Sequence, residues 1–267
     1  MAARWTVIAL VAAFAVAASA QAQTPPPTGG YLNGAPLGYA PPPKPTDPLV
    51  NELDLNRVRA ATPAKDSMAF QEAKSDADAY YAKDIVRRFD DATGQLLYQG
   101  DRPLLVALLT KVIVDTGAYV DPVKKANGRP RPYIEDPSIP VCEMAYLAGT
   151  EHQSYPSGHA MNGYATALIL AEVFPDHRNA IVARGVRYGD NRVVCGVHHP
   201  IDVDAGRLFG IAYFDKVMLD PKFKADLQCV EAEQALIKDK TPLPKPCADW
   251  KAEVLRTPVT ATAAKLF

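Results

Sequence analysis

Apolar side chains at the three- and four-residue spacing of helices recur along most of this chain. The stretches with this spacing are residues 52–59, 66–89, 104–120, 161–174, 179–195, 201–219 and 221–237. Pro103 stands at the first turn of one stretch, where it costs no hydrogen bond, and Pro175 ends another. The alternation of apolar and polar residues that predicts strands is nearly absent. The pattern therefore predicts an all-α, single-domain protein of about eight helices, without internal repeats.

The first residues have the composition of an export signal. Arg4 is the only charge before an apolar run over residues 5–18, and two small-x-small sites follow at 18–20 and 20–22. These features predict a secretory signal peptide over residues 1–22. The run is shorter than the roughly 20 residues of a spanning helix, so we expect cleavage rather than an uncleaved anchor. We expect no later segment to span a bilayer, which predicts a soluble periplasmic or secreted protein with no stable membrane insertion.

Charge and length restrict the partners and the domain organisation. The formal net charge is −1, so the chain lacks the strongly basic composition that binding to nucleic acid usually needs. Residues 23–48 are rich in proline and glycine, a composition that runs as extended or polyproline segments. We expect a disordered leader over 23–39, with an arm laid over the domain or a neighbouring subunit as the alternative, and we expect residues 39–43 to pack. The helical domain then covers residues 49–240, and residues 241–267 form a C-terminal tail.

The four cysteines all follow the predicted signal peptide. An even number of cysteines in an exported protein indicates disulfides, and no Cys-x-x-Cys pair suggests zinc. Three pairings are open, and we favour Cys142–Cys195 and Cys229–Cys247. The first bridge would tie the loop before Ser157 to a later helix. We predict no metal site and no cofactor.

The stretch 154–159, Ser-Tyr-Pro-Ser-Gly-His, has the features of a helix N-terminus that binds anions. Ser157 is a natural N-cap, and Pro156 keeps the helix from extending backwards. The first amides of a helix are unpaired and lie at its positive end, so Ser157 and Gly158 can cradle an oxyanion. His159 sits at the mouth, where a protonated imidazole could donate to a leaving oxygen. The alternative is an ordinary capped helix with an incidental histidine.

A second group, Arg192, His198 and Asp202, spans the end of one predicted helix, a loop and the start of the next. Pro200 fits the first turn of the later helix, so Asp202 can reach back to accept the Nδ1 proton of His198. A carboxylate there fixes the tautomer and leaves Nε2 to attack phosphorus. Alone, His198 and Asp202 could be a structural pair. His199 is the alternative imidazole, although its spacing to Asp202 is less suited to a contact on the same face.

A basic turn lies upstream, at residues 124–131. Prolines follow both of its arginines and bias Arg129 and Arg131 towards extended conformations. Phosphate is bound by cations and by planar guanidinium donors, which Lys124, Lys125 and the two arginines supply. The alternative is a solvated, charged loop.

Taken in order, these motifs resemble a known signature. The order is Lys124, six residues and Arg131-Pro132, then Pro156-Ser157-Gly158-His159, then Arg192, five residues, His198, three residues and Asp202. It resembles the three-part signature of the PAP2 phosphatase and vanadium haloperoxidase superfamily, and the chain is most similar to the bacterial class A non-specific acid phosphatases. The similarity covers residues 39–237, and its register pairs Lys124 with Arg131 rather than with Arg129. One departure is Asn191, where that family usually has serine, and we expect it to alter the support of the site.

The resemblance implies a PAP2-type helical bundle and a metal-independent acid phosphatase that hydrolyses small phosphate monoesters of broad specificity. The residues that it assigns to the phosphate are Lys124, Arg131, Ser157, Gly158 and Arg192. His198 would attack in line to form a phosphohistidine, His159 would protonate the leaving alcohol, and Asp202 would hold His198. Water would then hydrolyse the intermediate, with His159 as the base. A histidine acid favours mildly acidic pH.

Other functions would use the same residues. A vanadium haloperoxidase would hold vanadate with them, and a lipid phosphate phosphatase would act on phosphatidate-like substrates, although lipid members are typically multi-spanning. The preferred substrate, phosphotransfer to alcohols and the oligomeric state are left open, and the resemblance favours a homo-oligomer. A third hypothesis is an exported phosphate-binding or envelope protein without turnover. Asn191 is its only support, and the two histidines with Asp202 argue against it.

Overall fold

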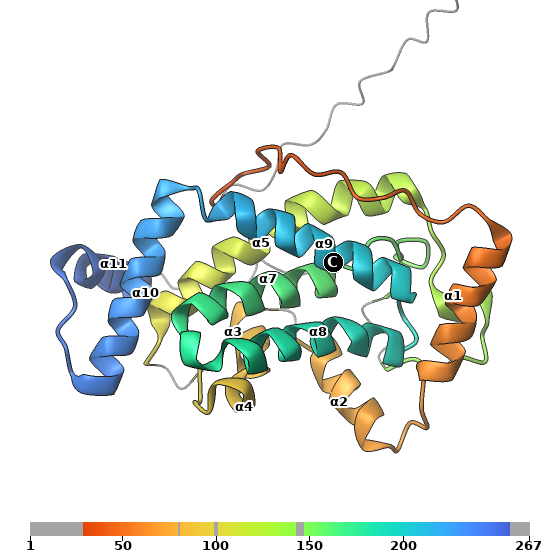
Figure 1. Ribbon diagram of the computed structural model, residues 1–267, viewed down its shortest axis with the longest axis horizontal. Helices are drawn as coiled ribbons and strands as arrows, with labels where there is room; N and C mark the ends of the chain where they lie inside the picture. The colour runs from red at the N-terminus through yellow and green to blue at the C-terminus, as the bar shows by residue number, and fades with distance from the viewer. Residues whose placement is uncertain (1–28, 80, 99–100, 143–146, 257–267) are drawn as a thin grey trace, which may run out of the picture.

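Helices make up the regular structure in the part of the chain that the computed structural model describes, residues 29–79, 81–98, 101–142 and 147–256 (Figure 1). No strand occurs in these ranges, and the predicted all-α class is confirmed. The helices are α1 (Pro48–Ala61), α2 (Met68–Ala77), α3 (Ala82–Arg87), α4 (Asp90–Thr93), α5 (Pro103–Asn127), α6 (Pro132–Glu135), α7 (Gly158–Val173), the 3₁₀ helix η1 (Pro175–His177), α8 (Arg178–Val194), α9 (Pro200–Val217), α10 (Pro221–Asp239) and α11 (Lys245–Arg256). The predicted signal peptide, residues 1–22, lies outside the described residues.

The described ranges hold more helices than the eight or so expected, partly because the helix predicted over residues 66–89 is divided. Ser67 caps the first piece, α2, by accepting a hydrogen bond from the Phe70 amide at 3.2 Å. Just after α2, the carbonyl of Ala79 accepts a hydrogen bond of 3.3 Å from the Tyr188 hydroxyl. The backbone there bonds to another helix instead of continuing its own. The predicted tail contributes the further helix α11.

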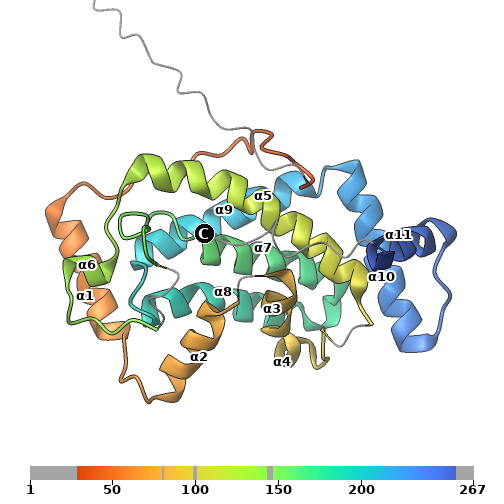
Figure 2. The same cartoon turned by 180° about the vertical axis from the view of Figure 1, so that it is seen from behind.

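Helix α7 lies at the centre of the molecule, between α8 and α9, with α5 packed behind it (Figure 1, Figure 2). Nearly all of its residues are buried, as expected of a helix that is apolar on every side. Glycines permit the close approach of its neighbours. A Cβ atom at Gly206 of α9 would lie 2.2 Å from the Ser157 carbonyl oxygen, and one at Gly163 would lie 2.2 Å from the Tyr188 ring. The start of α7 is therefore held directly against α8 and α9.

The helical stretch Pro103–Glu135, most of which is α5, is apolar enough by length and composition to cross a membrane. It is the one stretch of this kind found among the described residues. This corrects the expectation that no segment after the signal peptide reaches that length and apolarity. In the fold, 61% of its most apolar window is buried. The covering elements are α3, α7, α10 and α11. Packing on several neighbours accounts for the apolar composition of α5.

Residues 29–47, which we call the N-terminal arm, run along α5 and α9 without forming a helix (Figure 1, Figure 2). The buried carboxylate of Asp115 in α5 accepts hydrogen bonds from three successive arm amides, those of Tyr31 at 2.7 Å, Leu32 at 2.9 Å and Asn33 at 3.0 Å. The expectation of a disordered leader was therefore wrong for residues 29–39. A proline- and glycine-rich segment lacks internal hydrogen bonds, and here a side chain of the domain supplies them.

The later part of the arm packs as expected and reaches the loop before α7. The Tyr39 ring meets that of Phe209 in α9 edge to face, with centroids 5.5 Å apart. The Pro42 carbonyl accepts a hydrogen bond from the Tyr155 hydroxyl. Lys44 Nζ donates to the carbonyl of Asn127 at 2.5 Å. The arm thus joins the end of α5 to the Ser154–His159 stretch.

Both favoured disulfides are present, Cys142–Cys195 and Cys229–Cys247. The first joins the segment after α6 to the end of α8, where the Cys142 amide also donates to the Cys195 carbonyl at 3.3 Å. The second joins α10 to α11. Part of the predicted tail is thereby fixed to the domain.

Candidate active site

Three cations of the predicted signature lie buried together. Lys124 is in the last turn of α5, Arg131 caps α6 and Arg192 is in the last turn of α8. Their exposures are 2%, 4% and 1%. Lys124 Nζ donates to the Gln153 carbonyl at 2.7 Å, and Arg131 Nη1 donates to the Val197 carbonyl at 2.9 Å. Burial, together with the charges of Arg131 and Arg192, holds the pKa of Lys124 well below its ordinary value. Such a cluster is suited to binding an anion.

His198 lies between this cation cluster and Asp202. Its Nε2 atom is 3.2 Å from Arg131 Nη1, and its Nδ1 atom is 3.5 Å from Asp202 Oδ2. An arginine only donates, so Nε2 is the acceptor and the ring proton is on Nδ1, facing the carboxylate. Burial, with a further contribution from the charges of Arg131 and Lys124, holds the pKa of His198 well below its ordinary value, although the hydrogen bond and charge of Asp202 act in the opposite direction. The imidazole is therefore neutral at mildly acidic pH.

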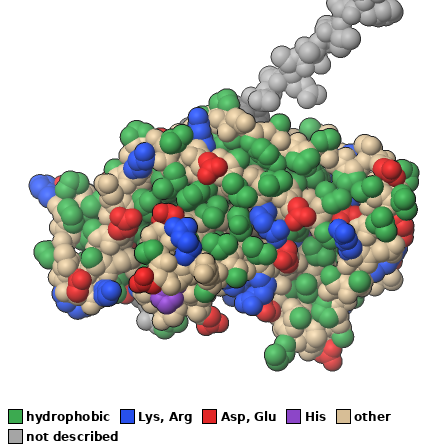
Figure 3. Space-filling model, in the orientation of Figure 1, with side chains coloured by type: hydrophobic (Ala, Val, Ile, Leu, Met, Phe, Trp, Pro, Cys, Tyr) green, Lys and Arg blue, Asp and Glu red, His purple; other side chains and the backbone are tan. Residues whose placement is uncertain are grey.

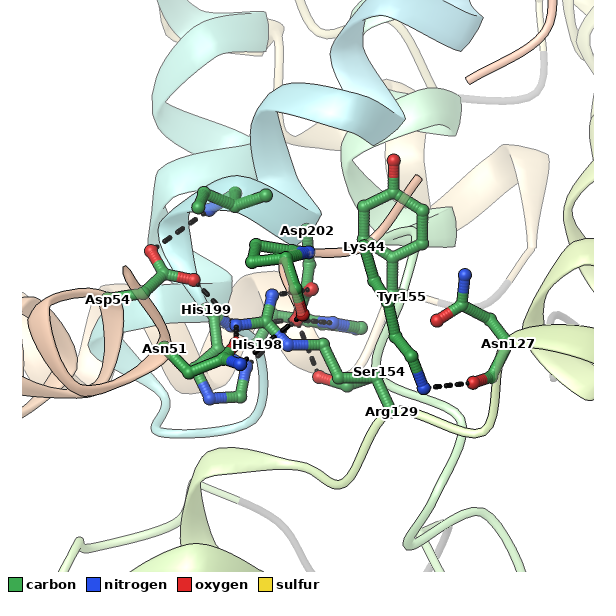
Figure 4. Close-up of polar contacts among 12 residues, drawn as sticks. Lys44, Asn51, Asp54, Asn127, Arg129, Ser154, Tyr155, His198, His199 and Asp202 are labelled. Carbon is green, nitrogen blue, oxygen red and sulfur yellow. Dashed lines mark hydrogen bonds and ion pairs between the residues drawn. The ribbon is translucent and has the colours of Figure 1, made fainter. Parts of the chain in front are cut away.

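Asp202 is a fully buried carboxylate at which several segments meet (Figure 4). Its Oδ1 atom accepts from Arg129 Nη1 at 2.6 Å, and Oδ2 accepts from the Ser154 hydroxyl at 2.6 Å and the His199 amide at 2.9 Å. Burial alone would raise the pKa of Asp202. The hydrogen bonds from His198 and His199 and the charge of Arg129 reverse this and hold the pKa well below its ordinary value. The carboxylate of Asp202 is therefore ionised in mild acid as well as at neutral pH.

His199 also contacts Asp202, contrary to the expectation from its spacing. Its Nδ1 atom is 3.2 Å from Asp202 Oδ2, closer than the 3.5 Å of His198. Its Nε2 atom is 2.9 Å from Glu135 Oε2 in α6. The two nitrogens of His199 are thus both engaged by carboxylates, whereas Nε2 of His198 meets Arg131. Between the two, the geometry favours His198 as the imidazole that faces an anion.

Sequence reasoning missed two charged residues around the site, Asp54 and Glu135, and the contacts of a third. Arg129, considered there only as a cation for phosphate, donates to Asp202 Oδ1 at 2.6 Å and to Asp54 Oδ2 at 2.9 Å (Figure 4). Asp54 also accepts from the Ile201 amide at 3.3 Å, across 147 positions of sequence. The prolines after Arg129 and Arg131 are the sequence signal that marks this turn. Nothing in the local sequence points to Asp54 or Glu135, since each acts through a contact with a distant segment.

The start of α7 has the predicted cap. The Ser157 hydroxyl accepts from the Ala160 amide at 3.3 Å. The Ser157 amide donates to the Asp202 backbone carbonyl at 2.9 Å, which fixes this turn beside α9. Gly158 is the first residue of the helix and is buried. The first amides of α7 therefore supply donors at the positive end of a helix.

His159 is held at the second position of α7. Its ring is stacked on that of Tyr188, with centroids 6.1 Å apart and planes at 20°. The backbone of Ala77 acts to raise the pKa of this imidazole. Burial, followed by the charges of Arg192 and His198, holds the pKa of His159 well below its ordinary value. Its charge is therefore sensitive to an anion bound nearby.

The structure brings all of the predicted site residues into one region. Lys124, Arg192 and His198 lie close enough to His159 for their charges to change its pKa, and Ser157 bonds to the backbone of the Asp202 turn. Within the described ranges, no group of three or more His, Cys, Asp or Glu side chains is arranged to hold a metal ion. The predicted residues contribute three cations, two imidazoles and a carboxylate to this region.

Comparison with known proteins places this arrangement in a family. The model of the PAP2 superfamily matches residues 102–221. An acid phosphatase of Zymomonas mobilis subsp. mobilis is 32% identical over 229 residues, which cover 84% of this chain and 86% of that protein. The chain belongs to the PAP2 superfamily. A non-specific acid phosphatase of Providencia stuartii is 32% identical over 63% of this chain and 68% of its own. A lipid A 1-phosphatase of Rhizobium etli is 33% identical over 39% of this chain and 45% of its own.

The PAP2 match includes every predicted site residue, from Lys124 to Asp202, and it confirms the resemblance seen in the motifs. The N-terminal arm, α1 and α2 lie before the matched range. In this PAP2 protein, Asn191 stands where serine was expected, and its amide donates to Asp76 of α2 at 2.7 Å. The departure from the signature therefore has a specific partner outside the matched range.

Proposed function

We propose that this PAP2 protein is an exported acid phosphatase that hydrolyses phosphate monoesters of broad specificity through a phosphohistidine. The observation that carries the proposal is the distance of 3.2 Å between Arg131 Nη1 and His198 Nε2. It presents the lone pair of an uncharged imidazole among the cations suited to phosphate. The relatives named acid phosphatase support the same reaction.

Five groups hold the phosphoryl group in this proposal. They are the side chains of Lys124, Arg131, Ser157 and Arg192 and the backbone amide of Gly158. Their charges and donors complement the equatorial oxygens, where negative charge resides in the transition state. The cations are already buried together, so a bound phosphate relieves their mutual repulsion. The donor of Arg131 that faces Nε2 of His198 then turns to the phosphate, which frees this nitrogen for attack.

In the first step, Nε2 of His198 attacks phosphorus in line with the leaving oxygen. An N–P bond forms, the P–O bond to the alcohol breaks, and His159 gives its proton to the leaving oxygen. Asp202 keeps the ring of His198 oriented and stabilises the positive charge that develops on it. The anionic substrate raises the proton affinity of His159, which the buried cations otherwise lower.

In the second step, water attacks the phosphohistidine. His159, now neutral, takes a proton from the water as the O–P bond forms. The N–P bond breaks and returns His198 to its starting tautomer, with the Nδ1 proton towards Asp202. Inorganic phosphate leaves from the same set of cations.

The test is hydrolysis of p-nitrophenyl phosphate by the mature protein from acidic to neutral pH, with excess EDTA and with vanadate. We expect activity that survives EDTA and is blocked by vanadate, a mimic of the pentacoordinate transition state. Loss of activity to EDTA would contradict the metal-independent mechanism. Halide oxidation by the vanadate-loaded protein without ester hydrolysis would favour the haloperoxidase. An absence of both activities would favour the phosphate-binding protein.

A pair of matched substitutions tests the nucleophile. His198→Asn should abolish turnover and the acid-labile phosphoryl label on the protein. His152→Asn makes the same change at an exposed histidine of the preceding loop and should leave turnover unchanged. Near-native turnover of His198→Asn would refute the assignment.

A lipid phosphate is the second candidate substrate. It is favoured by the match to a protein named lipid A 1-phosphatase, which covers 39% of this chain. The two substrates share a phosphate monoester and differ in the group attached to it. Comparing kcat/KM for p-nitrophenyl phosphate with that for a detergent-dispersed lipid phosphate distinguishes them. A preference of more than about a hundredfold for the lipid would assign the protein to that class.

Export and self-association complete the proposal. The signal peptide over residues 1–22 should be removed, which N-terminal sequencing of the protein from a periplasmic fraction tests.

Hydrophobic side chains gather on the face seen in Figure 3, where α9 lies in Figure 1. Leu208 and Ile211 of α9 are 43% and 37% exposed. Exposed apolar surface of this kind supports a homo-oligomer, which light scattering on the purified protein tests.

A further inference from the structure

Asp76, near the end of α2, is a buried carboxylate with two donors from α8 and an arginine at the end of α3 around it. Its exposure is 1%. Asn191 Nδ2 donates to Oδ2 at 2.7 Å, and Arg184 Nη2 donates to Oδ1. Arg88 Nε lies 3.9 Å from Oδ1. Because a buried carboxylate is stable only with such partners, Asp76 fastens α2 to α8 at this point.

The residues that follow Asp76 contact the imidazole assigned as the acid. The backbone of Ala77 lies close enough to His159 to influence its imidazole. The carbonyl of Ala79 accepts from the hydroxyl of Tyr188 at 3.3 Å, and the Tyr188 ring is stacked on His159. The end of α2 and one face of α8 therefore fix the ring of His159 together.

We propose that Asn191 and Asp76 are positioning residues, which set the orientation of His159 for proton transfer to the leaving group. The inference rests on the phosphatase function proposed above. Asn191 is 6% exposed, and its amide holds Asp76 in the turn that presents Ala77 to His159. Neither side chain is placed on the substrate. Both act through the backbone of α2.

The contact between residue 191 and Asp76 depends on the length of the side chain at position 191 and on its hydrogen-bond donors. An asparagine amide carries two N–H donors on a side chain one atom longer than that of serine. In this chain it spans the distance between α8 and Asp76. The replacement of the usual serine by Asn191 therefore adds a link between two helices beside the acid.

The leaving group provides a readout that is specific to His159. As the P–O bond breaks, the proton of His159 goes to the leaving oxygen, and a more basic leaving group depends more on that proton. The value of kcat/KM covers the steps up to formation of the phosphohistidine. Its dependence on the leaving group therefore reports proton transfer separately from hydrolysis of the intermediate.

The experiment compares kcat/KM for phenyl phosphate and 2,4-dinitrophenyl phosphate in the full protein. In Asn191→Ala, the value for phenyl phosphate should fall about tenfold, a fraction of the roughly 10²–10⁴ that a general acid supplies. The value for 2,4-dinitrophenyl phosphate, whose leaving group needs no proton, should fall less than about twofold. Asn191→Asp keeps the size of the side chain and sets a second carboxylate against Asp76. Its selective loss on phenyl phosphate should be larger.

The control is Asp190→Asn, at the adjacent residue of α8. Asp190 is exposed and pairs with Arg207 at 2.7 Å, so both kcat/KM values should be unchanged. The inhibition constant of inorganic phosphate should also be unchanged in Asn191→Ala, because the cations that bind phosphate are kept. Equal losses on the two esters, or no loss on either, would overturn the inference. If the wild-type protein hydrolyses neither ester, the proposed function fails and the inference fails with it.

Asp76→Asn tests the other member of the pair. It should show the same selective loss on phenyl phosphate. Should this variant fail to fold because Arg184 loses its buried counter-charge, the Asn191 variants still decide the question, since they keep Asp76 paired with Arg184.

Discussion

The Nε2 atom of His199 lies 2.9 Å from Oε2 of Glu135, which ties the start of α9 to α6. The Nδ1 atom of the same ring lies 3.2 Å from Asp202 Oδ2. A neutral imidazole has one N–H, so only the imidazolium donates to both carboxylates. Burial and the charge of Arg129 lower the pKa of His199, but the hydrogen bonds to Asp202 and Glu135 outweigh them and raise it. The negative charge of Asp54 in α1 faces the same ring.

The raised pKa predicts stability that depends on pH. A group whose pKa is higher in the folded state stabilises the fold fully below about pH 6.5, the ordinary value for histidine, and this stability is lost as the pH rises through the folded-state pKa. Glu135→Gln should therefore lower the free energy of unfolding by about 1 kcal/mol at pH 5 and by less at pH 9. The value is modest because 29% of the Glu135 side chain is exposed. Urea unfolding at the two pH values measures it.

Glu52→Gln is the matched control for that measurement. Glu52 is 56% exposed and pairs with Arg59 on the surface, so its substitution should change stability little at either pH. An equal loss in Glu135→Gln at both pH values would contradict a protonated His199.

Activity should be confined to acidic pH, because burial lowers the pKa values of both proposed catalytic imidazoles. The acid, His159, must carry a proton, so kcat/KM should fall as the pH rises above its lowered pKa. The nucleophile, His198, must be neutral, and its lowered pKa keeps it neutral in mild acid. We expect a bell-shaped profile whose alkaline limb lies below about pH 6.5, after correction for ionisation of the ester. An alkaline limb above pH 7 would show that His159 is not the acid.

Arg129 should be essential to the fold of the site. It is 3% exposed and pairs with both Asp54 and Asp202. Arg129→Met removes the guanidinium that pairs with two buried carboxylates and should lower the free energy of unfolding by about 3–5 kcal/mol, with loss of activity. Arg207→Met makes the same change at an arginine that pairs with the exposed Asp190, and should lower it by less than about 1 kcal/mol. Similar effects of the two substitutions in urea unfolding would contradict the role given to Arg129.

Asp115 should control the N-terminal arm. Its carboxylate accepts from the amides of Tyr31, Leu32 and Asn33 and from the Tyr213 hydroxyl at 3.1 Å. Asp115→Ala removes all four bonds, and the arm should detach because buried donors without acceptors each cost about 1–3 kcal/mol.

Limited proteolysis followed by mass spectrometry checks this prediction. Cleavage within residues 29–47 should become at least about tenfold faster in Asp115→Ala, since local opening sets the rate of cleavage. Asp204→Ala removes an exposed surface carboxylate and should leave the rate unchanged. Unchanged cleavage in Asp115→Ala would mean that other contacts hold the arm.

Local pattern was enough for the groups that the chain places near one another. The residues beside Ser157 predicted that it caps its helix. The spacing of four residues predicted that His198 and Asp202 form a pair. The contact between His199 and Asp202 was judged poor because a uniform helical face was assumed. In the structure His199 is the N-cap of α9, where the backbone is extended and the ring can turn back.

The local sequence pattern could not predict contacts between segments that lie far apart in the chain. Asp54 in α1 meets the start of α9 across 147 positions, and Glu135 meets His199 across 64. An isolated acidic residue in an amphipathic helix looks like a solvated surface charge, and only the packing of α1 and α6 against the site shows otherwise. Composition correctly predicted that residues 29–47 form no helix. It could not predict that the distant carboxylate of Asp115 accepts hydrogen bonds from the amides of this segment.

The N-terminal arm is the first of the described segments to be synthesised, yet the residues that bind it are made much later. Asp226, which accepts a hydrogen bond of 2.9 Å from the Tyr31 hydroxyl, follows that tyrosine by 195 positions. Until α10 has emerged, the arm lacks part of its binding surface. Docking of the arm is therefore a late event, which completes the fold only after nearly the whole chain has been made. A chain that ends before α10 would leave its N-terminal arm undocked, and proteases would cleave it there.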